Sequence, residues 1–196
     1  MEDKVQLLHE LHKQYDMRSA MHQKRVAELA YKITEKISAS DELLNNIYNA
    51  GLLHDIGKIF VPKTVLKSNN ELSQREIDIL RDHSRIGADF LERRGFNKFI
   101  INGAREHHER LNGEGYPEGL KENSISIEGR IIAICDVYDA MTSSRPYRKQ
   151  PYNKMETIKK MSNSKKNIFD KHLLQILKQV IWEDKKEKAK EFLSYA

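Results

Sequence analysis

The stretch LLHDIGK, residues 52–58, sets His54 directly before Asp55 at the end of an apolar run. Apolar residues lie on both sides of the pair, so the pattern places two titratable groups in the core. A carboxylate buried without a partner costs several kcal/mol, so a buried Asp55 needs a partner. Two interpretations stay open for this stretch alone: a metal ion bound by the pair, or an aspartate that caps a helix beside a hydrogen-bonded core histidine.

Further residues of the ligand type interrupt apolar helix faces elsewhere in the chain. A single histidine on such a face is more often an ordinary core residue, but this many would leave numerous buried polar groups unsatisfied unless they met at a metal. The candidate metal ligands are His22, His54, Asp55, His83, His107, His108 and Asp136. The three remaining histidines lack such company and are interpreted as surface or packing residues: His9, His12 and His172.

The chemistry of these ligands narrows the choice of metal ion. The chain has a single cysteine, Cys135, which excludes a cysteine-based structural zinc site. Imidazole and carboxylate together suit iron, manganese or zinc with open positions for water. Seven ligands exceed the need of one ion, and Asp55 could bridge two ions through its two oxygens. Two ions about 3.5–4 Å apart clamp the attacking and leaving oxygens of a phosphoryl displacement, with a bridging hydroxide as the nucleophile.

The elements that must position these residues are expected to be helices. Apolar residues recur at helical spacing through a chain with only nine glycines and four prolines, and no period-two strand pattern occurs. We therefore expect an all-α protein with a single helical-bundle domain over 21–182, a helical extension over 1–20 and a charged helix or tail over 183–196. A capping-box pattern at Ser73 and Glu76 predicts the start of one long helix that reaches Leu91. The glycine-rich stretch 111–120 predicts a shaped loop at the rim of the site.

Composition excludes several other classes of protein. No apolar run approaches the ~20 residues of a membrane span, and the N-terminus does not resemble a signal peptide. A lone cysteine suits a reducing compartment, so we expect a cytoplasmic protein without a membrane partner. The net charge of +5 is spread over solvated helix faces and loops, and no basic recognition helix is found, so we expect no nucleic-acid partner.

Three motifs carry a family resemblance over roughly residues 20–180. HDIGK, residues 54–58, resembles the core motif of the HD superfamily of metal-dependent phosphohydrolases, and HHERLNGEGYP and DVYDAMTSSRPYR resemble its HD-GYP branch. The resemblance implies an all-helical phosphodiesterase that hydrolyses cyclic di-GMP to linear pGpG and in some members to GMP. The alternatives are hydrolysis of another phosphoester, such as mixed cyclic GMP-AMP or a nucleotide, and a non-catalytic signalling interaction module.

The resemblance also assigns roles to individual residues. The seven candidate ligands match the metal ligands of the family, with Asp55 central to catalysis. Lys58 resembles a lysine that contacts the scissile phosphate, and Arg145 and Arg148 resemble arginines that hold substrate phosphates, as guanidinium forks suit phosphate oxygens. Members with three metals carry a glutamate one turn before the first histidine, where this chain has Arg18, so we expect two divalent ions, iron or manganese, with zinc as a third choice.

The resemblance leaves regulation open. Family members usually follow a sensory domain, whereas about 20 residues precede the first motif here, so a separate regulatory protein could take that part. The first helix could also pair with a second copy of the chain to form a homodimer.

Overall fold

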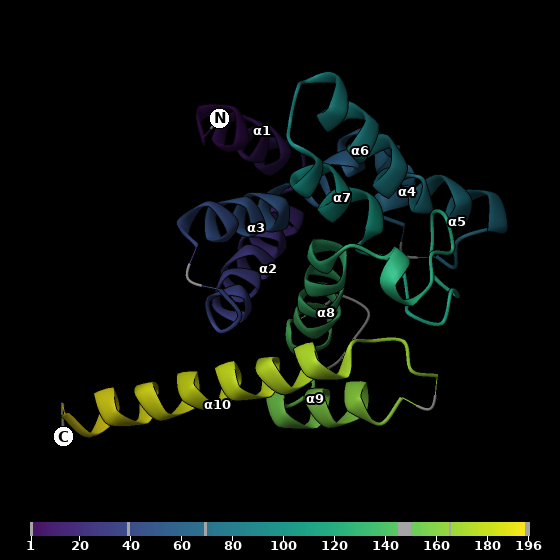
Figure 1. The fold of residues 1–196 in the computed structure, drawn as a ribbon. Coiled ribbons are helices and arrows are strands. Elements are labelled where there is room, and N and C mark those ends of the chain that lie inside the picture. The colour runs from purple at the N-terminus through teal and green to yellow at the C-terminus, as the bar shows by residue number, and fades with distance from the viewer. Residues whose placement is uncertain (1, 39, 69, 145–149, 165, 195–196) are drawn as a thin grey trace.

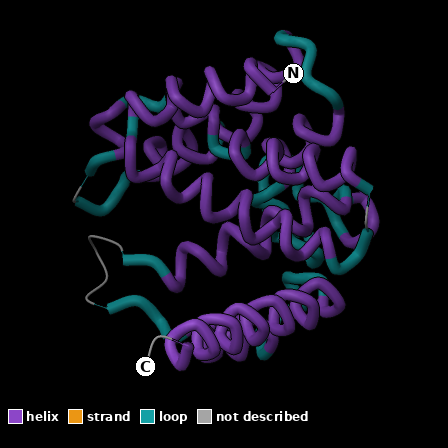
Figure 2. The backbone as a smooth tube through the Cα atoms, turned by 90° about the vertical axis from the view of Figure 1, so that its left-hand side faces the viewer, coloured by secondary structure: helices purple, strands orange, loops and turns teal. Residues whose placement is uncertain are grey.

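The computed structural model describes residues 2–38, 40–68, 70–144, 150–164 and 166–194, and the regular elements in these ranges are helices (Figure 1). The elements are α1 (Glu2–Tyr15), α2 (Met17–Glu35), α3 (Asp41–Leu53), η1 (Ile56–Phe60), α4 (Lys63–Leu66), α5 (Gln74–Arg81), α6 (His83–Arg93), α7 (Lys98–Glu106), η2 (Glu122–Ser124), α8 (Ile127–Thr142), α9 (Lys154–Ser162) and α10 (Lys171–Ser194). The view turned by 90° shows helices joined by loops throughout the described segments (Figure 2). The expected all-α fold is confirmed.

Two apolar clusters hold the helices together, and they meet at α2 and α3. One cluster joins α1, α2, α3, η1, α6 and α7, with Leu53, Ile56 and Leu91 fully buried. The other joins α2 and α3 to α8, α9 and α10, with Ile33, Ile132 and Leu177 at its centre. The candidate ligands lie on, or directly after, helices of one cluster or the other, so packing of the whole domain fixes their positions.

Helix starts follow local capping chemistry. The Asp16 side chain accepts hydrogen bonds from two backbone amides at the start of α2, and Ser126 caps α8. Ser73 and Glu76 form the reciprocal capping box that the sequence predicts at the start of α5.

The helix expected from Ser73 to Leu91 is instead two helices, α5 and α6, which meet at Asp82. Side chains at the junction take over carbonyls of the last turn of α5: His83 Nδ1 lies 2.6 Å from the Leu80 oxygen, and Ser84 Oγ donates to the Arg81 oxygen. Such side-chain bonds compete with the backbone ladder and bend helices. The prediction of one continuous helix was wrong at Asp82, directly before the candidate ligand His83.

The helices at the two ends of the chain, α1 and α10, pack differently from each other. α1 packs Val5 and Leu8 into the apolar cluster, whereas Leu11, three residues after Leu8, is 46% exposed and His12 is fully buried instead. α10 runs unbroken past residue 182 and projects beyond the other helices (Figure 1). The domain division at residues 20 and 182 stays a prediction. Within the described part of the chain, no helix has the length and apolarity to cross a bilayer.

Candidate metal centre

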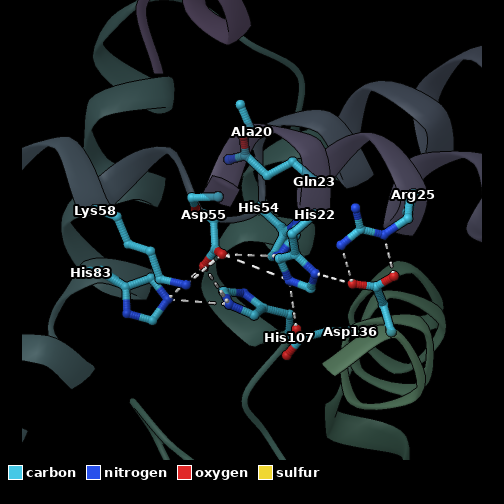
Figure 3. A network of polar contacts seen from close by, with 12 residues as sticks. Ala20, His22, Gln23, Arg25, His54, Asp55, Lys58, His83, His107 and Asp136 are labelled. Carbon is cyan, nitrogen blue, oxygen red and sulfur yellow. Dashed lines mark hydrogen bonds and ion pairs between the residues drawn. The ribbon is translucent and has the colours of Figure 1, made fainter. Parts of the chain in front are cut away.

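Seven side chains from several helices converge on one largely buried region, and Figure 3 labels six of them, all but His108. Their potential ligand atoms fall into two groups, within each of which all atoms lie within 4.8 Å of one another. The first group is Asp55, His83, His107 and His108, and the second is His22, His54 and Asp136. The structure thus brings together all seven residues that the sequence singled out, and a role in metal binding remains to be proposed from their geometry.

Asp55 lies between the two groups and presents one carboxylate oxygen to each. Its Oδ1 is 3.2 Å from His83 Nε2 and 3.7 Å from His107 Nε2. Its Oδ2 is 3.5 Å from His54 Nε2 and 4.0 Å from His22 Nε2. This is the placement that a carboxylate shared by two cations requires.

Three of the histidines are oriented by the same local device at a helix end. Each places Nδ1 near the carbonyl oxygen three residues earlier: His54 to Gly51 at 2.8 Å, His83 to Leu80 at 2.6 Å, and His107 to Ala104 at 2.9 Å. A carbonyl only accepts, so Nδ1 must carry a proton, and in the neutral ring Nε2 then keeps its lone pair. Helix ends have carbonyls to spare, which explains why histidines at these positions turn their Nε2 atoms into the centre.

Backbone packing brings two of these helix ends into contact. A Cβ built on Gly57 would lie 1.9 Å from the carbonyl oxygen of His83, which is closer than any side chain tolerates. Only glycine therefore lets η1 approach α6 this closely. The contact sets Asp55, two residues before Gly57, against the imidazole of His83.

The donor set fits a metal ion. His54 is completely buried, and its Nε2 has no hydrogen-bond partner among the described residues. Burial lowers the pKa of His54 to about 3, so the ring is neutral and keeps a lone pair. The Nε2 atoms of His83 and His107 lie only 3.3 Å apart, although both are lone-pair bearing by the argument above. A cation between such nitrogens would satisfy groups that the protein leaves unpaired.

Among the described residues, Lys58 is the lysine that pairs with Asp55. Its Nζ lies 2.5 Å from Asp55 Oδ2, and the lysine remains partly exposed while Asp55 is buried (Figure 3). Burial alone would raise the pKa of Asp55, but Lys58 and His54 outweigh it and hold that pKa well below its ordinary value. Asp55 is therefore a carboxylate. Arg145 and Arg148, the expected phosphate-binding residues, lie outside the described residues.

Sequence reasoning missed Asp139 and Arg25. Asp139 Oδ2 lies 2.6 Å from His22 Nδ1, and Arg25 donates to both oxygens of Asp139 at 2.6 and 2.9 Å. Burial alone would lower the pKa of His22, but bonds to Asp136 and Asp139 raise it to about 9. The signal was present in DVYD, because Asp139 follows Asp136 at the i,i+3 spacing that shares a helix face.

The glycine-rich loop lies against the centre, as expected. The Tyr116 ring stacks on His108 at 4.5 Å between ring centroids. Glu109 holds the loop in place by accepting hydrogen bonds from the backbone amides of Glu118, Gly119 and Leu120. Both oxygens of Glu109 are thus engaged in shaping the loop.

Comparison with known proteins assigns the chain to a family. The family model described as HD domain matches residues 5–173. The chain belongs to the HD domain family. The HD family match starts inside α1 and ends at the beginning of α10, so it includes every candidate ligand.

Curated relatives of this HD domain are named as phosphodiesterases. The chain is 39% identical over 143 residues to a cyclic di-GMP phosphodiesterase of Pseudomonas aeruginosa, a match that covers 72% of this chain and 34% of the relative. It is 39% identical over 148 residues to a cyclic di-GMP phosphodiesterase of Thermotoga maritima, a match that covers 74% of this chain and 40% of that relative. A 3'3'-cGAMP-specific phosphodiesterase of Vibrio cholerae is 37% identical over 127 residues, which covers 65% and 30%. These relatives confirm the resemblance to the HD-GYP branch.

Solved structures show the same HD fold. A protein from Bdellovibrio bacteriovorus, titled as an HDG"Y"P protein, aligns with a TM-score of 0.67 at 22% identity over 82% of this chain and 51% of that chain. The HD domain of the phosphodiesterase PgpH from L. monocytogenes aligns with a TM-score of 0.61 at 19% identity, covering 86% and 92%. The chain spans about a third of the length of the curated relatives from P. aeruginosa and V. cholerae.

Proposed function

We propose that this chain is a metal-dependent phosphodiesterase that hydrolyses cyclic di-GMP to linear pGpG, with GMP as a further product. The observation that carries the proposal is the position of Asp55, which offers one oxygen to each of two groups of donors. Relatives named cyclic di-GMP phosphodiesterases support the choice of substrate.

The same geometry supports two divalent ions, iron or manganese. One would be held by His83, His107 and His108, the other by His22, His54 and Asp136, with Asp55 common to both. Bound ions of this kind polarise phosphoryl oxygens and lower the pKa of water. Nitrogen and oxygen donors suit both iron and manganese, and the same donors also bind zinc.

The chain's own cations would bind and orient the substrate. Lys58 is the partly exposed residue next to Asp55, so its ammonium can donate to an oxygen of the scissile phosphate. Arg145 and Arg148 would hold substrate phosphates through charge-assisted hydrogen bonds. Tyr116, stacked on His108, offers an aromatic wall beside the centre.

A second candidate substrate is the mixed cyclic dinucleotide 3'3'-cGAMP. Relatives named as specific for it are 37% and 32% identical to this chain. The two substrates differ in one base and share their phosphates, so the residues described above would serve either.

We also propose a cytoplasmic location and a homodimer formed through α1. Leu7 and Leu11 are 61% and 46% exposed on this helix, an apolar pair that a second copy could cover. A separate regulatory protein could act on the same domain.

Hydrolysis assays with both cyclic dinucleotides test the proposal. Protein freed of metal by a chelator and reloaded with Mn²⁺ or Fe²⁺ is incubated with each substrate, and products are separated by chromatography. We expect pGpG from cyclic di-GMP only in the metal-loaded samples. If only 3'3'-cGAMP is hydrolysed, it replaces cyclic di-GMP as the proposed substrate. If neither dinucleotide is hydrolysed, the proposed activity is contradicted.

A further inference from the structure

The His22 imidazole is held at both nitrogens by carboxylates from one helix. Asp136 Oδ1 lies 3.0 Å from Nε2, and Asp139 Oδ2 lies 2.6 Å from Nδ1. The two aspartates are one turn apart on α8, while His22 comes from α2. The Asp139 contact is therefore on the side of the ring that faces away from the candidate metal centre.

Asp139 has no capacity left to bind a metal itself. Its Oδ1 accepts from Arg25 Nε at 2.6 Å and from Ser143 Oγ at 3.0 Å, while its Oδ2 receives Arg25 and His22. Four donors thus occupy its two oxygens. A carboxylate used this way can orient a neighbour but cannot also coordinate an ion in the centre.

Arg25 fixes Asp139 from the same helix that carries His22. Arg25 is three residues after His22 on α2, so both side chains reach α8 from one face. Its guanidinium makes a two-pronged contact with the carboxylate, the geometry that constrains both partners most strongly. In Figure 3, Arg25 lies on the side of His22 away from Asp55, Lys58 and His83.

We propose that Asp139, held by Arg25, is a positioning residue that makes His22 a metal ligand through Nε2. An acceptor at Nδ1 keeps the proton there, aims the ring and increases the basicity of the other nitrogen. The inference rests on the proposed metal centre and adds to it two residues that touch no ion. His22 differs in this from His54, His83 and His107, whose Nδ1 atoms face neutral backbone carbonyls.

Metal binding by Asp139→Asn tests the inference. Asparagine keeps the size of the side chain but removes the charge and offers an amide donor to His22. We expect the ion held by His22, His54 and Asp136 to bind about 10–100-fold more weakly in equilibrium dialysis against Mn²⁺, with the other ion unaffected. Arg25→Lys keeps the charge and loses the fork, so a smaller loss at the same site is expected.

The chain offers a matched control in a second arginine–aspartate pair. Arg105 Nη2 donates to Asp89 at 2.9 Å, between α7 and α6 and outside the donor groups. Asp89→Asn should bind both ions as the wild type does. Wild-type affinity at both sites in Asp139→Asn, or equal weakening in Asp89→Asn, would overturn the positioning role.

A proton NMR spectrum gives a readout that does not depend on activity. In the zinc-loaded protein, which is diamagnetic, the His22 Nδ1 proton should give a downfield resonance that is absent in Asp139→Asn and present in Asp89→Asn. A spectrum in which Asp139→Asn retains that resonance contradicts the inference. Failure of the wild type to bind any metal would instead contradict the proposed function, and the metal-free spectrum would still test the His22–Asp139 bond.

Discussion

The ammonium group of Lys58 donates a hydrogen bond to Oδ2 of Asp55 at a distance of 2.5 Å, and the two residues are three positions apart in the chain. This is the same oxygen that faces His54 and His22. The lysine thus offsets the negative charge at the point where the two donor groups meet. A phosphate that reached Asp55's surroundings would meet this ammonium first, because Lys58 is the more exposed partner.

Replacing Lys58 with Met should slow hydrolysis more than it weakens substrate binding. The loss of one charge-assisted contact is worth about 1.5–3 kcal/mol, or about 10–150-fold in rate. The measurement is kcat and KM for cyclic di-GMP, with Lys63→Met as control, because Lys63 lies instead over the ring of Tyr15. An effect confined to KM would mean that Lys58 holds the substrate without assisting the reaction.

Arg145→Ala and Arg148→Ala should raise KM more than they lower kcat. Each would remove a guanidinium that binds a substrate phosphate, with an expected effect of about 10–150-fold. Titration of the variants with cyclic di-GMP measures the change directly. Unchanged affinity in both would show that the substrate phosphates bind elsewhere.

Gly57→Ala should separate η1 from α6. The new methyl group would lie 1.9 Å from the His83 carbonyl, so the backbone must move, at a cost of about 1–3 kcal/mol in the free energy of unfolding. The shift should also weaken metal binding, because Asp55 and His83 meet at this contact. Urea unfolding and Mn²⁺ dialysis measure the two effects, and wild-type values in both would contradict the packing argument.

His12 should make the metal-free protein sensitive to acid. Burial lowers the pKa of this histidine to about 4 from its ordinary 6.5. Between these values the unfolded chain binds a proton that the native state does not, so stability is full above pH 6.5 and falls as the pH drops toward 4. At pH 5 the loss from His12 is about 2 kcal/mol.

His12→Gln isolates this contribution. The other buried histidines titrate in both proteins, so they cancel in the comparison. Urea unfolding of chelator-treated protein at pH 7.5 and pH 5 should show a loss of stability that is about 2 kcal/mol smaller in the variant. Equal losses in the two proteins would show that His12 is protonated in the native state.

Much of the fold could be predicted from sequence because helical periodicity and capping are local. The capping box at Ser73 is a case in which a four-residue pattern determines a helix start. The break at Asp82 could not be predicted, since it depends on side-chain bonds from His83 and Ser84 to carbonyls of the preceding turn. Helical spacing from Val5 and Leu8 also favours Leu11 over His12 as the next buried residue, whereas the structure buries His12.

The candidate ligands of the site could be predicted from the sequence, but the residues that orient them could not. Polar residues on apolar faces identified the seven candidate ligands, because a buried donor must find a partner somewhere. The orienting groups were not found by this reasoning. Asp139 shares a face of α8 with Asp136, a spacing that the apolar-face argument did not use, and only the packing of α8 against α2 brings Arg25 to it.

The number of ions depends on acids near the centre that are free to bind. Arg18 is exposed, and its guanidinium has no lone pair to offer a metal. Glu109 is used by the glycine-rich loop, and Glu106 accepts a hydrogen bond from the Ser126 amide at 2.7 Å. The donor groups found in the described chain contain neither acid, which favours two ions over three.

The central claim is that Asp55 joins two groups of donors into one centre for two ions. Elemental analysis after dialysis against Mn²⁺ tests it most directly, on the wild type and on Asp55→Ala at the same protein concentration. We predict two ions per chain in the wild type and fewer than one in the variant, because both ions lose a shared ligand. An unchanged ratio in Asp55→Ala, or a wild-type ratio of one or three, would contradict this account.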